Sequence, residues 1–161
     1  MKTLLDYINE ELATPANTLG MGGVDPTNEP APSEVNGFVI LKPGFCNHED
    51  EWCKMLGNNG WKIIQKKKFK MTPETAKALY AMHKSKPFYD DLCTYMSSDD
   101  CICAMCYKDC EDPIGDMKTI KDKVRNAWGI DDMKNAMHSS DSLDNVKREY
   151  GLIFENKLGT N

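Results

Sequence analysis

The sequence has no apolar run near the roughly 20 residues that a membrane-spanning helix needs, and its N-terminus lacks the apolar core of a signal peptide. These two absences predict a cytoplasmic protein with no membrane partner. An excess of positive charge is also absent, because the formal net charge is −5. Residues 1–35 carry one lysine against six acids, and the remainder is balanced. Such a chain offers no electrostatic footprint for a nucleic acid polymer.

Paired metal-binding knuckles are missing as well, although the chain has seven cysteines. Cys101, Cys103, Cys106 and Cys110 lie close together, but no second C-x-x-C-like pair accompanies them. The cluster is either a zinc site or a buried strand that uses cysteine as a small apolar residue. We favour the strand, because Cys101 and Cys103 would share one face and Cys106 the other. We therefore predict reduced thiols and no metal site.

The chain length of 161 residues suits one domain of ordinary size preceded by a tail. Residues 1–12 carry apolar side chains at helical spacing and predict a short amphipathic helix. Residues 13–36 are rich in proline and glycine, which is typical of a flexible linker. We interpret residues 1–36 as a docking peptide on a tether, with an unknown partner. It resembles peptides that direct proteins into tailed-phage heads, which would make the protein virion-associated.

The folded domain, residues 37–161, alternates strand patterns with amphipathic helices. Short apolar or alternating runs indicate the strands, and capping residues followed by 3.6-residue periodicity indicate the helices. The order β-α-β-α-α-β-α-β-α predicts an α+β domain with helices packed on a small, mostly antiparallel sheet. The expected strands are 38–41, 61–71, 101–107 and 136–139, and the expected helices are 48–57, 73–85, 87–96, 116–128 and one starting after Asp141 or Ser142.

His138 stands out from the other histidines by its neighbourhood. It ends a predicted strand, with Asn135 three residues before it and Ser140 two residues after it. Glu149 follows eleven residues later, at the border of the buried face of the last helix. A carboxylate there needs a partner, which either Ser140 or His138 could supply. A histidine held in this way has a fixed tautomer and orientation, as a nucleophile or base requires.

Four segments in sequence order carry a resemblance to one family. NAMHSSDSLDNVKREYGLIF resembles the active-site segment of nucleoside diphosphate kinases, typically N-x-x-H-G-S-D-S followed by an S-A-x-x-E-I helix. FVILKPG resembles the family's first strand and its Lys-Pro-Asp-Gly motif. Tyr80 through HKSKPFYDDLCTYM is similar to a Tyr…Lys/Arg-Pro-Phe-Phe…Tyr-Met block. VRNAWGIDDMKNAMH resembles the L-R-x-x-F-G…N-A-V-H form of a divergent branch, so the chain resembles a divergent, phage-encoded member over residues 38–154.

The resemblance implies both a fold and an activity. The fold would be a ferredoxin-like βαββαβ sandwich, with a four-stranded antiparallel sheet covered by helices. The activity would be transfer of the γ-phosphoryl group of a nucleoside triphosphate to a nucleoside diphosphate, by a ping-pong mechanism through phosphohistidine and with nucleotide-bound Mg²⁺. The alternative is a catalytically weak nucleotide-binding or structural module on the same fold.

The family's functional residues carry over to eight positions of this chain. His138 would be the nucleophile, and Ser140 and Glu149 would steer it. For two of the others a plainer interpretation stays open: Phe88 could be a core residue, and Tyr80 could serve a helix contact. The resemblance implies that Lys42 and Arg125 neutralise phosphate charge and that Tyr80 lies beside the transferred group. It also implies that Asn135 hydrogen-bonds the sugar hydroxyl and that Phe88 stacks on the base.

The sequence departs from the family pattern in the region before His138. Between Cys106 and Arg125 the chain is too short for both the usual helix and the phosphate-contacting loop. We find no counterpart of the family's second phosphate-binding arginine or of its phosphate-contacting threonine. An alternative alignment places Arg125-x-x-x-Gly129 on that second arginine. We reject it because Arg125 lies ten residues before Asn135, the family spacing of the other arginine.

The sequence also departs from the family pattern at two single residues and in one missing loop. Gly44 replaces the aspartate of Lys-Pro-Asp, and Ser139 replaces the glycine after the histidine. The long loop that helps to form trimeric faces in the family is absent. We therefore expect a small homo-oligomer, with a dimer favoured because closed two-fold symmetry is the commonest arrangement.

Overall fold

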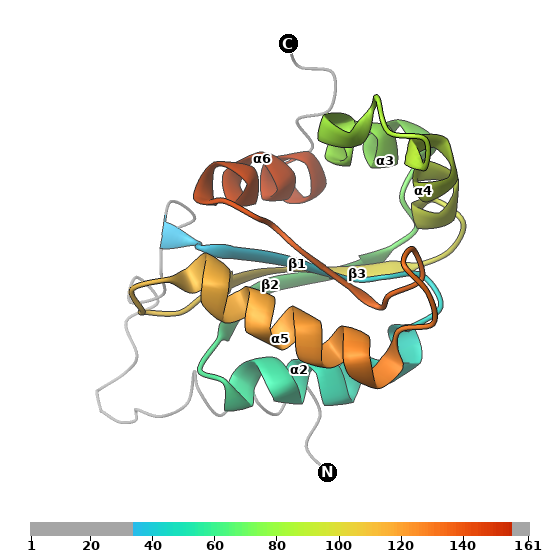
Figure 1. The fold of residues 1–161 in the computed structure, drawn as a ribbon. Coiled ribbons are helices and arrows are strands. Elements are labelled where there is room, and N and C mark those ends of the chain that lie inside the picture. The colour runs from blue at the N-terminus through green and yellow to red at the C-terminus, as the bar shows by residue number, and fades with distance from the viewer. Residues whose placement is uncertain (1–33, 156–161) are drawn as a thin grey trace.

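A computed structural model describes residues 34–155, and Figure 1 shows its layers. Four strands form one antiparallel sheet in the order β2-β3-β1-β4. This arrangement confirms the expected four-stranded ferredoxin-like sandwich. The strands are β1 (Gly37–Leu41), β2 (Lys62–Phe69), β3 (Cys101–Tyr107) and β4 (Met137–Ser139).

Helices cover both faces of the sheet (Figure 1). On one face lie α2 (Glu49–Asn58) and α5 (Pro113–Trp128), and on the other α3 (Pro73–Leu79), α4 (Tyr89–Met96) and α6 (Leu143–Phe154). Two 3₁₀ turns, Cys46–His48 and Ala81–His83, precede α2 and α4. The central strand β1 contributes side chains to the hydrophobic core on each face of the sheet, because side chains alternate along a strand. Val39 and Leu41 pack with α2 and α5, whereas Phe38 and Ile40 pack with α3, α4 and α6.

Side-chain caps determine where three of the helices begin. Thr72, Asp112 and Ser142 each accept a hydrogen bond from the backbone N–H three residues later. Helix α5 was expected to begin at residue 116 but begins at Pro113, because Asp112 caps it and proline suits its first position. The helix therefore spans 16 residues, and the connection from 129 to 136 joins it to β4.

The helix expected to run from Pro73 to Ser85 ends earlier, at Leu79. The chain then tightens into the 3₁₀ turn, in which residues three apart eclipse each other. Tyr80 and His83 consequently face the same side, with ring centroids 6.3 Å apart. The early end of α3 thus directs both rings toward the site described below.

The cysteines lie as the strand interpretation requires. Cys101 and Cys103 belong to the core under α3, α4 and α6, and Cys106 to the core under α2 and α5. Burial raises the pKa of the Cys106 thiol and that of the Cys103 thiol, so both stay protonated. Within residues 34–155, no three His, Cys, Asp or Glu side chains are arranged to hold a metal ion.

The expected tail helix 1–12 and most of the expected linker lie outside the described residues. The last linker residues belong structurally to the domain: Val35 is buried in the core under α3, α4 and α6, and the backbone N–H of Asn36 donates to the Cys106 carbonyl. Across residues 34–155, no helix is long and apolar enough to cross a bilayer.

Candidate active site

His138 occupies the middle of the edge strand β4, where it pairs with Ile40 of β1. Because Ile40 faces α3, α4 and α6, the His138 side chain points to the same side of the sheet. Its ring lies edge-on to Tyr80, with 5.6 Å between centroids, and edge-on to Phe38 at 6.4 Å. Ser142 caps α6 directly after the strand, and this helix brings Glu149 back toward the histidine.

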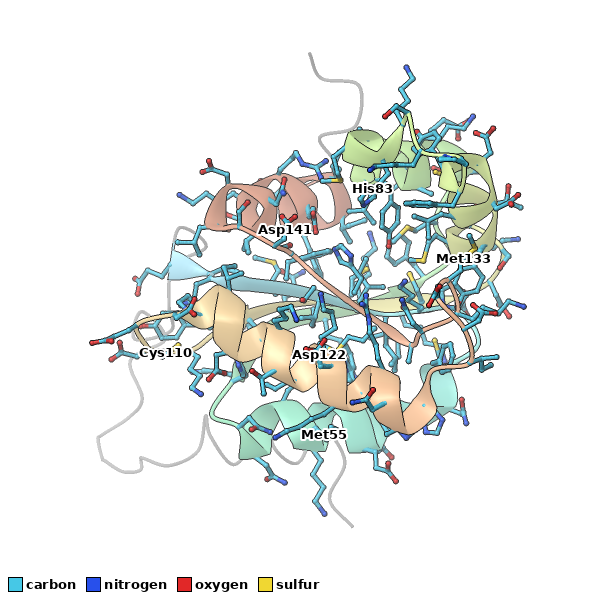
Figure 2. The ribbon with its side chains drawn as sticks, viewed as in Figure 1. Met55, His83, Cys110, Asp122, Met133 and Asp141 are labelled. Carbon is cyan, nitrogen blue, oxygen red and sulfur yellow. The ribbon has the colours of Figure 1, made fainter. Side chains whose placement is uncertain are left out.

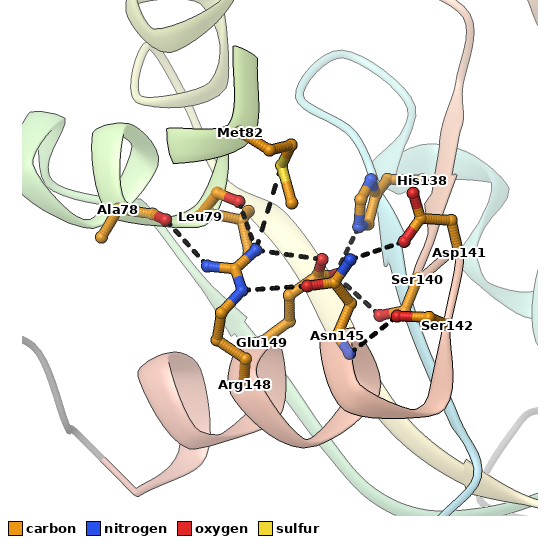
Figure 3. A network of polar contacts seen from close by, with 10 residues as sticks. All are labelled: Ala78, Leu79, Met82, His138, Ser140, Asp141, Ser142, Asn145, Arg148 and Glu149. Atoms are coloured by element: carbon orange, nitrogen blue, oxygen red, sulfur yellow. Dashed lines mark hydrogen bonds and ion pairs between the residues drawn. The ribbon is translucent and has the colours of Figure 1, made fainter. Parts of the chain in front are cut away.

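A buried carboxylate holds the histidine ring (Figure 3). His138 Nε2 lies 2.7 Å from Glu149 Oε1, and Ser140 Oγ donates to the same oxygen at 2.7 Å. The Glu149 side chain is only 1% exposed, so these partners offset the cost of removing its charge from water. Ser140 therefore contacts the carboxylate and not the ring. Figure 3 shows the other ring nitrogen of His138 pointing away from this network.

Arg148 supports the carboxylate from the opposite side. Its guanidinium donates to the carbonyls of Ala78 at 2.9 Å and Leu79 at 3.0 Å, and lies 3.4 Å from Glu149 Oε2 (Figure 3). These contacts tie α6 to the last turn of α3. The sequence interpretation gave Arg148 no role. Its position next to Glu149 was the only available signal, and its partners are 70 residues away in sequence.

A pocket of about 470 Å³ opens beside His138. It brings together five of the eight residues singled out in the sequence, namely Lys42, Tyr80, Phe88, Arg125 and His138. Glu149 and Ser140 stand behind the histidine, and Asn135 lies on the connection before β4. The lining residues are Lys42, Tyr80, His83, Phe88, Leu92, Arg125, Asp132, Met133 and His138.

Lys42 is the most deeply buried cation of the pocket, with 4% of its surface exposed. Its backbone N–H donates to the Ala136 carbonyl at 2.8 Å, and its Nζ donates to the Met133 carbonyl at 3.3 Å. Burial, together with repulsion from Arg125 and Lys121, lowers the pKa of Lys42 to about 7. The amine is thus poised to gain a proton when negative charge enters the pocket.

Arg125 reaches the pocket from the last turn of α5. Its Nε donates to the Met137 carbonyl at 3.0 Å, which fixes the guanidinium beside β4. The two terminal nitrogens bond to no other side chain or carbonyl in the described part of the chain, so they can serve a ligand. Planar, forked donors of this kind match phosphate oxygens.

Two buried polar atoms in the described region lack a hydrogen-bond partner, and both belong to residues singled out in the sequence. The first is the Tyr80 hydroxyl, whose pKa burial raises well above its usual value. The second is Asn135 Oδ1, on a side chain whose Nδ2 donates to the Asp132 carbonyl at 2.8 Å. Buried polar groups are normally paired. These two fit a ligand that supplies an acceptor to Tyr80 and a donor to Asn135.

The structure excludes the core interpretation of Phe88. Its side chain is 43% exposed on the pocket wall, so it is not a core residue. His83, which sequence reasoning treated as an ordinary histidine, stands beside it with 5.5 Å between ring centroids. Figure 2 shows His83 next to α3, and Met133 in the connection that follows α5. Met133 and Asp132 also escaped the sequence analysis, because no local pattern distinguishes them from other loop residues.

The fold and the site define a class: a ferredoxin-like α+β protein whose edge strand presents a carboxylate-held histidine to a pocket with buried cations. The family model "Nucleoside diphosphate kinase" matches residues 36–158, and the chain belongs to this family. The resemblance to this family is thereby confirmed.

Relatives and solved structures agree with the family model. The nucleoside diphosphate kinase of Chloroherpeton thalassium is 32% identical over 129 residues, covering 73% of this chain and 90% of that protein. The one from Persephonella marina is 35% identical, with 73% and 91% covered. The nucleoside diphosphate kinase structure from Aquifex aeolicus superposes with a TM-score of 0.67 at 28% identity, covering 73% and 93%. That from Encephalitozoon cuniculi, at TM-score 0.65 and 18% identity over 76% and 90%, shows the common fold.

Proposed function

We propose that this chain is a nucleoside diphosphate kinase that works by a ping-pong mechanism through phosphohistidine at His138. The observation that best supports this proposal is the 2.7 Å contact between His138 Nε2 and the buried Glu149 carboxylate. His138 lines a pocket that Lys42 and Arg125 also line. Family membership over most of the chain supports the same activity.

The carboxylate determines which ring nitrogen is the nucleophile. An ionised carboxylate only accepts hydrogen bonds, so Nε2 carries the proton and donates it to Glu149 Oε1. The lone pair is therefore on Nδ1, the nitrogen that points away from the network in Figure 3. The nearby negative charge also stabilises the positive charge that the ring acquires when Nδ1 attacks.

Transfer then proceeds in two balanced half-reactions. His138 Nδ1 attacks the γ-phosphorus of the triphosphate, an N–P bond forms, and the bond to the bridging oxygen breaks to release the diphosphate. A terminal oxygen of the second diphosphate attacks the phosphohistidine, and the N–P bond breaks. Lys42 and Arg125 offset the charge on the phosphoryl oxygens, and the Tyr80 hydroxyl donates to one of them.

The substrates are nucleotides as their Mg²⁺ complexes. Mg²⁺ usually keeps several waters and takes one or two carboxylates besides the phosphates. The pocket offers Asp132 as its single carboxylate, and no three-residue ligand set exists within residues 34–155. The phosphates would thus hold the ion. Phe88 would stack on the base, and stacking of this kind tolerates every nucleobase. Asn135 Oδ1 would accept a hydrogen bond from a sugar hydroxyl.

Labelling with γ-³²P-ATP tests this function against the alternative of a non-catalytic module. The full chain should acquire a label that is stable in base and labile in acid, as expected for phosphohistidine. Added nucleoside diphosphate should then remove the label and yield labelled triphosphate. A protein that binds ATP yet acquires no label would be the nucleotide-binding module. The expected dimer belongs to the same proposal, and light scattering on the full chain measures its mass.

Nucleotide binding should take up a proton near pH 8. The pKa of Lys42 is about 7 in the free protein, so the amine is mostly neutral at pH 8. Phosphate charge favours the ammonium form and raises this pKa, so binding draws a proton from the buffer. Calorimetry with a nucleoside diphosphate in two buffers of different ionisation enthalpy measures the uptake. Lys42→Met should abolish it, and equal binding heats in both buffers for the unmodified protein would contradict the prediction.

The same group makes stability depend on pH. The pKa of Lys42 in the folded chain lies below the value of about 10.5 expected in the unfolded chain. The unfolded chain therefore binds more protons between pH 7 and pH 10.5. The contribution of Lys42 to the free energy of unfolding accordingly rises with pH across this window.

A further inference from the structure

Lys121 is a cation near His138 that neither the sequence motifs nor the proposed mechanism uses. It lies on α5 one turn before Arg125, and residues four apart share a helix face. With His138 and Glu149 it lines a second pocket, of about 180 Å³. This pocket adjoins the first, because Tyr80, His83, Arg125 and His138 line both. Lys121 thus lines a pocket beside His138 that Phe88 does not line.

The Lys121 side chain is half-buried. Across residues 34–155 it makes no hydrogen bond or ion pair, whereas Lys118 on the same helix pairs with Asp122 at 3.0 Å. Burial lowers the pKa of Lys121, and repulsion from Arg125 lowers it further. Like charges held together away from water are unfavourable unless an anion joins them.

The nearby acids do not supply that anion. Asp122 and Asp141 both attract Lys121, but Asp122 is paired with Lys118, and Asp141 accepts from Asn145 Nδ2 at 2.6 Å. Figure 2 shows Asp122 on α5 and Asp141 close to α6, so the two acids come from different elements. A local ion pair therefore does not explain why Lys121 faces the site.

Few arginine side chains are available to bind phosphate in this chain. The sequence contains two arginines, Arg125 and Arg148. Arg148 is committed to the carbonyls of Ala78 and Leu79 and to Glu149. In phosphoryl transfer, negative charge is spread over three oxygens of the transferring group, and fixed cations around it lower the barrier. Arg125 alone can provide a guanidinium here, so further positive charge has to come from lysine.

We propose that Lys121 is a phosphate-binding residue, whose ammonium contacts oxygens of the phosphoryl group as it moves to and from His138. This inference rests on the proposed function and adds to it a third cation besides Lys42 and Arg125. The ligand that Lys121 recognises is the di- or triphosphate of the nucleotide, not its base or sugar.

The test compares Lys121→Gln with Lys123→Gln. Both remove one lysine charge from the same helix, but Lys123 is exposed and lines neither pocket. Rapid-quench measurement of phosphohistidine formation should give a rate about 10- to 100-fold lower for Lys121→Gln, and a rate within about twofold of the unmodified chain for Lys123→Gln. Lys121→Arg should restore most of the rate. Thermal unfolding of each variant verifies that the fold is kept.

A binding measurement makes the inference independent of turnover. Lys121→Gln should weaken binding of a nucleoside diphosphate and leave binding of the uncharged nucleoside unchanged. If the unmodified chain forms phosphohistidine and the two glutamine variants behave alike, the inference about Lys121 is wrong and the proposed function stands. If the unmodified chain forms none, the proposed function is wrong. The diphosphate affinities then decide alone whether Lys121 binds phosphate.

Discussion

His138→Ala should abolish the labelled intermediate and reduce phosphotransfer by roughly 10⁴- to 10⁶-fold, the scale seen when the nucleophile of a covalent mechanism is removed. Within the described site, His138 is the side chain whose geometry combines a fixed tautomer with a free ring nitrogen. Lys42 and Arg125 can still bind the nucleotide, so binding should persist while double-displacement kinetics disappear. Steady-state kinetics and acid-labile labelling measure the two effects.

Two further variants exclude a folding artefact. The alanine leaves the Glu149 carboxylate with Ser140 and Arg148 only, which is expected to lower stability. His138→Asn keeps a polar group near Glu149 and should be equally inactive. His48→Ala removes a histidine that stacks on Trp128, away from both pockets, and should be labelled like the unmodified chain. Transfer by His138→Ala near the unmodified rate would exclude His138 as the phosphoryl carrier.

Arg125→Ala should slow transfer by roughly 10²- to 10³-fold, which is typical of losing one preorganised donor. Some phosphohistidine should still form, because the nucleophile and Lys42 remain. Arg125→Lys should recover only part of the rate, since an ammonium keeps the charge and loses the fork and the Nε bond to Met137. Rapid-quench kinetics resolve these steps.

The matched control for Arg125 is Lys118→Ala, a loss of charge on the exposed side of α5 where Lys118 pairs with Asp122. It should change the rate by less than about twofold. An effect of Arg125→Ala as small as this control would remove Arg125 from the mechanism. An effect as large as that of His138→Ala would show that it does more than stabilise charge.

Glu149→Gln should lower the transfer rate by about tenfold, which is less than the effect expected of Arg125→Ala or His138→Ala. The amide oxygen can still accept from His138 Nε2 and from Ser140 Oγ, so the ring keeps its orientation and only the steering charge is lost. The sequence interpretation had Ser140 steering His138 alongside Glu149. The structure places its hydroxyl on the carboxylate, 2.7 Å from Oε1, so the oxygen at position 149 has to orient the ring.

Local patterns were sufficient to predict the strands and most helix starts. The strand 101–107 has the predicted bounds, and Ser142, one of the two caps proposed, begins the last helix. Side-chain periodicity and capping depend on neighbours within a few residues, so they can be read without the fold. Helix ends that depend on distant packing were predicted less well, as the early end of α3 at Leu79 shows.

The site depends on contacts between distant parts of the chain, and only the tertiary structure decided them. Lys42 Nζ meets a carbonyl 91 residues away, and Arg148 meets one 70 residues away. The lowered pKa of Lys42 results from its burial beside Arg125 and Lys121, and no spacing in the sequence encodes that burial. Sequence motifs therefore singled out His138 and Glu149, which the fold places in contact. The folded chain decided which cations face them, because burial and charge repulsion depend on distances in space.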